Sequence, residues 1–307
     1  MTRHALVIGA AWILAACHSL APSQRVDIDR YGPTCAQNTP AMSANVDGSG
    51  PPIVVLGGVI TGSIGMQQVA RRLAPHRRVI LLQNVNVEAA LARLPLQEPY
   101  SVGVERCALT AALNRLGITG RVDVVGYSYG GLIALDFTLL HPERVRSLTL
   151  VEPPAQWVLG PDELSAVDQS RFNQAALKIK HRLPSEAEAA ALVCVIFGCP
   201  PGDELHQARR LPLWPTVLRN RSALSGAFAV AEHRPASSLL EHLRAPVLYV
   251  SGVGSSPFHS RINTRFRRSL KAARSIELPG GHAVPVISAQ PLGAAILDFT
   301  AQRLPAE

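Results

Sequence analysis

Short apolar runs alternate with stretches of helical spacing through the first half of the chain. Four runs have the pattern of buried strands: PIVVLGG, RRVILLQN, RVDVVG and RSLTLVE, the last of which ends at residue 152. Between them, GMQQVARRLAPH, SVGVERCALTAALNRLGI and GGLIALDFTLLHPE place apolar residues at helical intervals. This alternation predicts an α/β fold with a mostly parallel sheet flanked by helices on both faces.

The alternation stops after residue 152. Residues 153–244 have helical and irregular patterns, and the strand-like runs APVLYVSG and RSIELPGG follow them, with a final helix, PLGAAILDFTAQRL. A helical insertion between two strands of one sheet predicts a lid over the carboxyl ends of the strands, where open parallel sheets bind ligands. We therefore expect a core of residues 51–152 and 245–307, and a helical lid of residues 153–244.

The N-terminus has the layout of a targeting segment. MTRHALVIGAAWILAACHSL combines a basic start with an apolar run that is too short to span a bilayer. The letters LAAC, which end at Cys17, resemble the bacterial lipoprotein box, in which the cysteine is lipidated. The resemblance implies a signal peptide at residues 1–16 and a lipid anchor on Cys17, and an ordinary signal peptide is the alternative. The polar residues 17–50 predict a tether and an N-terminal arm.

The residue after that cysteine bears on location. It is His18, and not the aspartate that the lipoprotein sorting rule associates with retention in the inner membrane. The resemblance therefore implies an exported protein anchored to the outer membrane and facing the periplasm, in a host that has one. The oligomeric state is left open by the sequence.

Composition adds few constraints. The chain has 307 residues, is 47% hydrophobic and carries a formal net charge of +8. Its densest basic cluster, RFRRSLKAAR at residues 265–274, has helical spacing and is interpreted as a solvated helix face. No nucleic-acid recognition motif accompanies it, so we expect no nucleic-acid partner. Attraction to an anionic membrane surface is an alternative for the same charges.

Four cysteines remain besides Cys17, and an even number in an exported protein permits disulfides. Cys194 and Cys199 are close enough in sequence to close a small loop, and Cys35 would then tie the arm to the segment that holds Cys107. Three pairings are open on the sequence alone. The spacings match no zinc site, and we expect neither a metal nor an organic cofactor.

One short motif carries the chemistry. Ser128 lies in GYSYG, directly after a strand-like run and directly before a helix-like one. A sharp turn at this place exposes the serine and needs small neighbours, which Gly126 and Gly130 provide. The next amide, on Tyr129, opens the helix, where an oxyanion is favoured. These features predict a nucleophilic serine with the Tyr129 amide as an oxyanion donor, against the alternative of a glycine-rich turn with an incidental serine.

With this motif in its strand–turn–helix context, residues 51–303 resemble the α/β-hydrolases with a helical lid. In that family the nucleophile, the acid and the histidine follow in this order along the chain. His282, in LPGGHAVP, lies after the last strand and before the last helix, as the family's base does. The family's first oxyanion donor follows the first strand, and the resemblance places it on the amide of Val59. The family usually has His-Gly after this strand, and this chain has the sequence LGG there.

The acid departs from the family pattern. Ser255 and Ser256 stand where an aspartate is usual, and no carboxylate occurs between residues 241 and 277. Some family members take the acid from the end of the preceding strand, which is Glu152 here. The alternatives are a dyad, in which a serine or a water orients His282, and an inactive site.

Together these patterns predict a membrane-tethered serine hydrolase that cleaves an ester or related acyl bond of a small substrate through an acyl-enzyme on Ser128. Haloalkane chemistry is disfavoured, because it needs a carboxylate nucleophile, and peptidase activity stays open. The alternative is a catalytically impaired binding or scaffold lipoprotein on the same fold. The lid carries no readable motif for the substrate.

Overall fold

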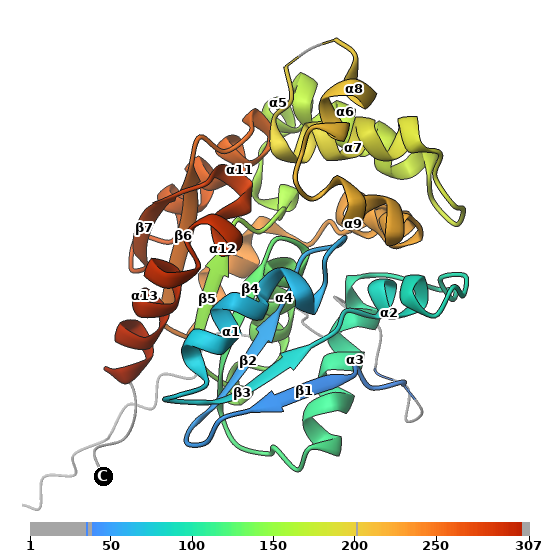
Figure 1. Ribbon diagram of the computed structural model, residues 1–307. Helices are drawn as coiled ribbons and strands as arrows, with labels where there is room; N and C mark the ends of the chain where they lie inside the picture. Colours follow the sequence, from blue (N-terminus) through green and yellow to red (C-terminus); the bar gives the residue numbers. More distant parts are fainter. Residues whose placement is uncertain (1–34, 36–38, 201, 303–307) are drawn as a thin grey trace, which may run out of the picture. The chain divides into compact units, whose positions relative to one another are not determined.

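The computed structural model describes residues 35, 39–200 and 202–302 (Figure 1). One seven-stranded sheet has the order β1-β3-β2-β4-β5-β6-β7, and every pairing is parallel except that of β1 with β3. The alternating apolar runs therefore predicted the mostly parallel sheet correctly. The strands are β1 Ala44–Asp47, β2 Pro52–Leu56, β3 Arg78–Leu82, β4 Val122–Tyr127, β5 Val145–Val151, β6 Val247–Val253 and β7 Arg274–Pro279.

Helices cover both faces of the sheet (Figure 1). On one face α3 (Val102–Arg115) packs beside α4 (Tyr129–Leu140), and on the other α1 (Gln67–Leu73) packs beside α13 (Ala289–Ala301). Alternate residues of the central strands point to opposite faces, so Ile53 and Val55 of β2 join the apolar core under α1 and α13. The remaining helices of the core are α2 Val85–Leu91, α11 Pro257–Ser269 and α12 Val284–Ile287.

The N-terminal boundary of the sheet differs from the prediction. Residues 44–47, which the sequence assigned to the polar arm, form β1, and its register pairs Ala44 with Leu82. Three of its four residues are exposed. An edge strand with little burial lacks the apolar pattern by which strands are recognised in a sequence, and this explains the missed element.

Between β5 and β6 the described residues form helices and no strand. Figure 1 shows these helices beyond the end of the sheet toward which β2 and β4 run. Their bounds are α5 Pro161–Leu164, α6 Val167–Lys178, α7 Glu186–Phe197, α8 Glu204–Arg209, α9 Trp214–Arg219 and α10 Phe228–Glu232, and the 3-10 helix η6 at Arg221–Ala227 precedes α10.

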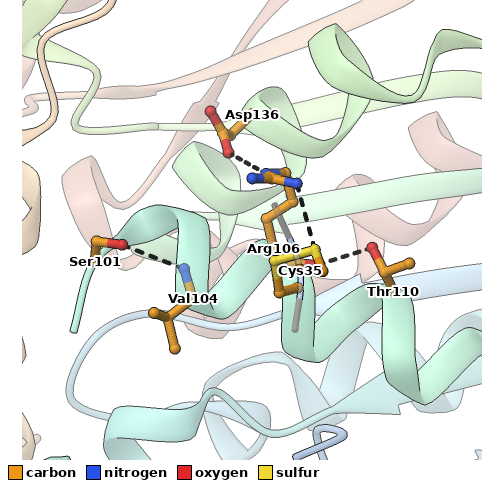
Figure 2. The surroundings of a disulfide bond; sticks show 7 residues. Cys35, Ser101, Val104, Arg106, Thr110 and Asp136 are labelled. Atoms are coloured by element: carbon orange, nitrogen blue, oxygen red, sulfur yellow. Dashed lines mark hydrogen bonds and ion pairs between the residues drawn. A yellow bond between two sulfur atoms is a disulfide. The ribbon is translucent and has the colours of Figure 1, made fainter. Parts of the chain in front are cut away.

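Two disulfides join the described cysteines: Cys35 with Cys107, and Cys194 with Cys199. The first ties residue 35 to α3, as Figure 2 shows. Next to it, Arg106 of α3 forms a buried ion pair with Asp136 of α4 at 3.0 Å. Of the three ways to pair four cysteines that the sequence leaves open, the structure contains Cys35 with Cys107 and Cys194 with Cys199.

In the described part of the chain, no single helix has the length and apolar composition to cross a membrane. A bent pair, Gly281–Ile287 with Ala289–Ala301, passes the same test, but α13 buries Leu292 and Ile296 in the core. The predicted signal peptide and Cys17 lie outside the described residues. On α11, Ile262 and Phe266 are buried while Arg267 and Arg268 are exposed, as the helical spacing predicted. The helix ends at Ser269, however, so Lys271 and Arg274 of the 265–274 cluster do not belong to its face, and Arg274 begins β7.

Candidate active site

Ser128 occupies the turn between β4 and α4. Its backbone has φ of 51°, a left-handed conformation that non-glycine residues adopt at a cost. The turn is tight: a Cβ on Gly126 would lie 2.3 Å from the carbonyl oxygen of Gly130, and one on Gly130 would lie 2.5 Å from that of Gly57. The glycines on either side of the serine are therefore required by contact between backbones, as the motif predicted.

His282 comes from the C-terminal part of the chain and lies next to Ser128. It lies in the short helix η8 (Gly281–Ala283) after β7, and it is buried. Its Nε2 is 3.0 Å from the Ser128 Oγ. The hydroxyl of Tyr127, directly before the serine, donates to the His282 carbonyl at 2.7 Å. The strand that presents Ser128 thus also fixes the backbone of His282.

Glu152 stands on the far side of the imidazole. Its Oε2 is 3.2 Å from the His282 Nδ1, so Ser128, His282 and Glu152 form one continuous hydrogen-bonded series. The residue directly follows β5, has a φ of 50° and is fully buried. The positive φ ends the strand and turns the carboxylate toward the histidine, which a residue continuing the strand would not do.

A group of polar residues surrounds this carboxylate, and of these only Ser255 was singled out from the sequence. The Oε1 of Glu152 accepts hydrogen bonds from the Gly252 amide at 2.9 Å, the Ser255 hydroxyl at 2.8 Å and the Asn263 Nδ2 at 2.6 Å. The buried hydroxyl of Tyr249 donates to the Asn263 Oδ1 at 2.6 Å and so holds the amide nitrogen toward Glu152. The loop after β6, which holds Ser255, therefore supports a carboxylate that directly follows the neighbouring strand, β5.

These contacts set the charge of Glu152. Burial by itself raises the pKa of a carboxyl group, but the hydrogen bonds from His282 and from the Gly252 amide, with the nearby imidazoles, outweigh it and lower the pKa of Glu152 to about 2. The group is therefore a carboxylate at neutral pH. A carboxylate that accepts from Nδ1 leaves Nε2 free to accept a proton from the serine.

The two backbone amides expected to hold an oxyanion lie at the serine. Val59 and Tyr129 line the same pocket as Ser128. In α4 the amides of Gly130 and Gly131 are bound to the Gly57 and Ser128 carbonyls, and the Tyr129 amide, as the first of the helix, has no carbonyl one turn before it. The other expected donor is the Val59 amide, which shares a peptide group with the Gly58 carbonyl. That carbonyl accepts from the Gly62 amide at 2.9 Å, and in a trans peptide the N–H points away from the C=O, so the Val59 amide points away from this bond.

Three buried asparagines fix the loop that carries Val59, and the sequence reasoning missed all of them. Their side-chain amides donate to three carbonyls of this loop: Asn84 to Gly57 at 3.0 Å, Asn86 to Val59 at 2.9 Å and Asn220 to Ile60 at 3.0 Å. Lone asparagines in loops and helix starts give no sequence signal for such a role. They support the loop in a chain that lacks the usual His-Gly.

A second imidazole lies against the first. His259 stacks on His282 with 3.8 Å between ring centroids and 23° between ring planes, and burial lowers the pKa of His259 to about 3. Ligand-type atoms of Glu152, His259 and His282 lie within 4.8 Å of one another. However, the lone pairs of imidazole nitrogens lie in the ring plane, so two nearly parallel rings do not direct them at one ion. The stacked pair therefore lacks the convergent geometry of a metal site.

The pocket beside Ser128 is narrow and mostly apolar. Both the core and the helices after β5 contribute to its walls, and His259 and Tyr129 are its ionisable lining residues. It is lined by Val59, Ser128, Tyr129, Pro154, Phe172, Ile196, Ala227, Val230, Phe258 and His259. The buried Ser128 hydroxyl is therefore largely shielded from water, which strengthens its hydrogen bond to His282.

Comparison with known proteins agrees with the fold described above. A family model described as the alpha/beta hydrolase fold matches residues 51–183. A thermophilic esterase from Thermogutta terrifontis superposes with a TM-score of 0.64 and 18% identity, over 85% of this chain and 93% of the other. The chain has the α/β-hydrolase fold.

Two curated relatives narrow the class of enzyme without fixing its substrate. A pimeloyl-[acyl-carrier protein] methyl ester esterase of Neisseria meningitidis serogroup C is 24% identical over 67% of this chain and 77% of its own length. A haloalkane dehalogenase of Sphingobium indicum is 25% identical over 85% of this chain and 92% of its own length. Both are hydrolases, which supports a hydrolase activity for this α/β-hydrolase-fold protein and leaves the bond that it cleaves undecided.

Proposed function

We propose that this protein is a serine hydrolase that cleaves an ester or related acyl bond through an acyl-enzyme on Ser128. We also propose that it acts outside the cytoplasm and is held at a membrane by a lipid anchor on Cys17. The observation that carries the catalytic proposal is the buried hydrogen-bonded series from the Ser128 Oγ through His282 to Glu152. A serine at position 128 also favours acyl transfer over dehalogenation, which needs a carboxylate nucleophile.

The mechanism follows from the positions of the atoms. The Ser128 Oγ attacks the acyl carbon while the His282 Nε2 takes its proton, and the charged Glu152 stabilises the imidazolium that forms. The amides of Val59 and Tyr129 hold the oxyanion. The imidazolium then protonates the leaving alcohol, and a water activated by the same Nε2 releases the acyl group as a carboxylate. No step needs a group that the chain lacks.

The anchored, extracytoplasmic location rests on different support. The LAAC sequence ending at Cys17 resembles a lipoprotein box, and it lies outside the described residues. The two disulfides in the described part are typical of proteins that fold in an oxidising compartment. An anchor on a soluble hydrolase would hold the site near a membrane surface without a spanning helix.

The catalytic proposal is tested with a fluorophosphonate probe, which reacts with activated serines. We expect labelling of the wild type and of Ser269→Ala, an exposed serine at the end of α11, and no labelling of Ser128→Ala. The melting temperature of Ser128→Ala should stay close to that of the wild type. A wild-type protein that takes up no label, and hydrolyses no p-nitrophenyl ester, would instead favour a binding lipoprotein that has lost catalysis.

A further inference from the structure

A second cavity lies among α2, the loops after α2 and α6, and the α9–η6 segment. Its volume is about 460 Å³, within the range of small-molecule sites. None of its lining residues belongs to the pocket beside Ser128. The proposed reaction makes no use of it.

One part of its wall is cationic and lacks partners. Arg93, Arg219 and Arg221 line the cavity, and in the described part of the chain none of the three forms an ion pair. The Nε of Arg221 is buried without a hydrogen-bond partner. A buried guanidinium donor without an acceptor costs free energy, which an anion in the cavity would recover.

The carboxylates close to the cavity are already engaged. Its other basic lining residues, His181 and Arg182, pair with Glu98 and Glu188, and no acidic residue lines the cavity. The unpaired arginines therefore face a space without a protein counter-ion.

Another part of the wall is apolar and open to water. Leu94, Leu183 and Leu218 line the cavity with 60%, 59% and 37% of their surfaces exposed. Large apolar side chains exposed around a concave site mark a binding surface more often than scattered surface leucines do.

The floor of the cavity is rigid. Val87 and Ala90 of α2 form a small buried core with Ala223 of η6. Asn86 bridges the same two elements, since its Nδ2 donates both to the Ala223 carbonyl and to the Val59 carbonyl, each at 2.9 Å. The end of α2, which precedes Arg93 and Leu94, and η6, which begins at Arg221, are therefore held at a fixed separation before any ligand binds.

We propose that this cavity binds an amphiphilic anion: a carboxylate or phosphate head group on a single alkyl chain, distinct from the substrate at Ser128. Arg93, Arg219 and Arg221 bind the head group, and the three leucines contact the chain. Guanidinium groups suit both head groups, because they form paired hydrogen bonds with planar or tetrahedral oxyanions.

The test is calorimetric titration of the Ser128→Ala protein with four probes: decanoate, decyl phosphate, 1-decanol and inorganic phosphate. We expect the two amphiphilic anions to bind at least tenfold more tightly than decanol or phosphate, because each of those lacks half of the ligand. Tighter binding of decanoate would indicate a free fatty acid as the natural ligand, and tighter binding of decyl phosphate would indicate a lipid phosphate.

Variants assign the binding to this cavity. Arg219→Gln and Arg221→Gln should each weaken decanoate binding about tenfold or more, and Leu218→Ser should weaken it with all arginines present. Arg71→Gln, an exposed arginine on α1, is the matched control and should bind like the parent. Equal binding by parent, Arg219→Gln and Arg221→Gln would overturn the proposal, as would decanol binding as tightly as decanoate, or no binding of either anion.

Discussion

At the scale of single residues, the site depends on two backbone conformations that are rare for non-glycine side chains. Ser128 and Glu152 both have φ near 50° and both directly follow a strand of the sheet. Each turn takes its side chain out of the strand direction, and His282 connects the two. The strain at both positions is offset by the hydrogen bonds that the turned residues make.

The first prediction concerns the charge of Glu152. Glu152→Gln keeps the size of the side chain but can offer its amide NH₂ to Nδ1, which favours the wrong tautomer of His282. We expect kcat on a p-nitrophenyl ester to fall by about 10³–10⁴-fold with little change in melting temperature. Glu143→Gln, an exposed carboxylate with no contact to the site, is the control. Wild-type turnover in Glu152→Gln would remove the acid from the mechanism and leave a serine–histidine dyad.

At the scale of elements, a buried network joins α3, α2 and α4 behind the serine. Glu105 of α3 accepts from the amides of Val85 and Asn86, where α2 begins, and from the Tyr100 hydroxyl, which also contacts the Tyr129 hydroxyl at 2.9 Å. Through these bonds the start of α4, next to Ser128, is tied to the helix that carries Asn86. Asn86 therefore belongs to both arrangements: its backbone amide donates to Glu105, and its side chain holds the loop that carries Val59.

This network makes stability depend on pH. Burial raises the pKa of Glu105 to about 7, although its hydrogen bonds act in the opposite direction. A carboxyl group whose pKa is higher in the folded state stabilises that state fully below its unfolded pKa of roughly 4.3, and the stabilisation is lost as pH rises through 7. The free energy of unfolding should therefore fall between pH 5 and pH 8 by on the order of 2–3 kcal/mol more in the wild type than in Glu105→Gln.

Urea unfolding at the two pH values measures this difference, and comparing the change across pH removes any constant cost of the substitution. Glu241→Gln, at an exposed position, is the control and should keep the wild-type slope. A slope in Glu105→Gln equal to that of the wild type would show that Glu105 does not titrate in this range.

The disulfides differ in the length of chain that they close. Cys35 and Cys107 are 72 residues apart, and Cys194 and Cys199 are 5 apart. On the chain-entropy argument, removing the first with paired alanines should lower the free energy of unfolding by about 4 kcal/mol, and removing the second by about 2 kcal/mol. Denaturant unfolding under oxidising conditions gives both values. A larger loss for the short loop would mean that its role is local packing of α7 beside the site, where Phe197 contacts His282.

At the scale of the whole molecule, a single lipidated residue, Cys17, is proposed to hold the enzyme at a membrane surface. Cys17→Ala should leave an unprocessed or soluble protein, because one lipidated residue is the only proposed attachment. His18→Asp should keep the lipid and shift the protein to the inner membrane in a host with two membranes. Fractionation with a radiolabelled fatty acid measures both variants. Wild-type protein in the soluble fraction without label would contradict the anchor.

The sequence by itself determined the elements with strong local patterns. The central strands and the helices between them were predicted because they are buried on one or both faces and their apolar spacing records it. Ser128 and His282 were located as candidates because a nucleophile turn and the loop after the last strand have local signatures, and the structure places their side chains 3.0 Å apart.

Only the tertiary structure decided how the remaining residues act on these two. Glu152 was one of three alternatives in the sequence, since nothing local distinguishes a strand-end glutamate that meets a histidine from one that does not. Its partners Ser255 and Asn263 lie more than 100 residues away along the chain, and so does Asn220 from the loop that it holds. Parallel strands bring the carboxyl ends of distant segments to one edge, and contacts made there leave no periodicity in the sequence.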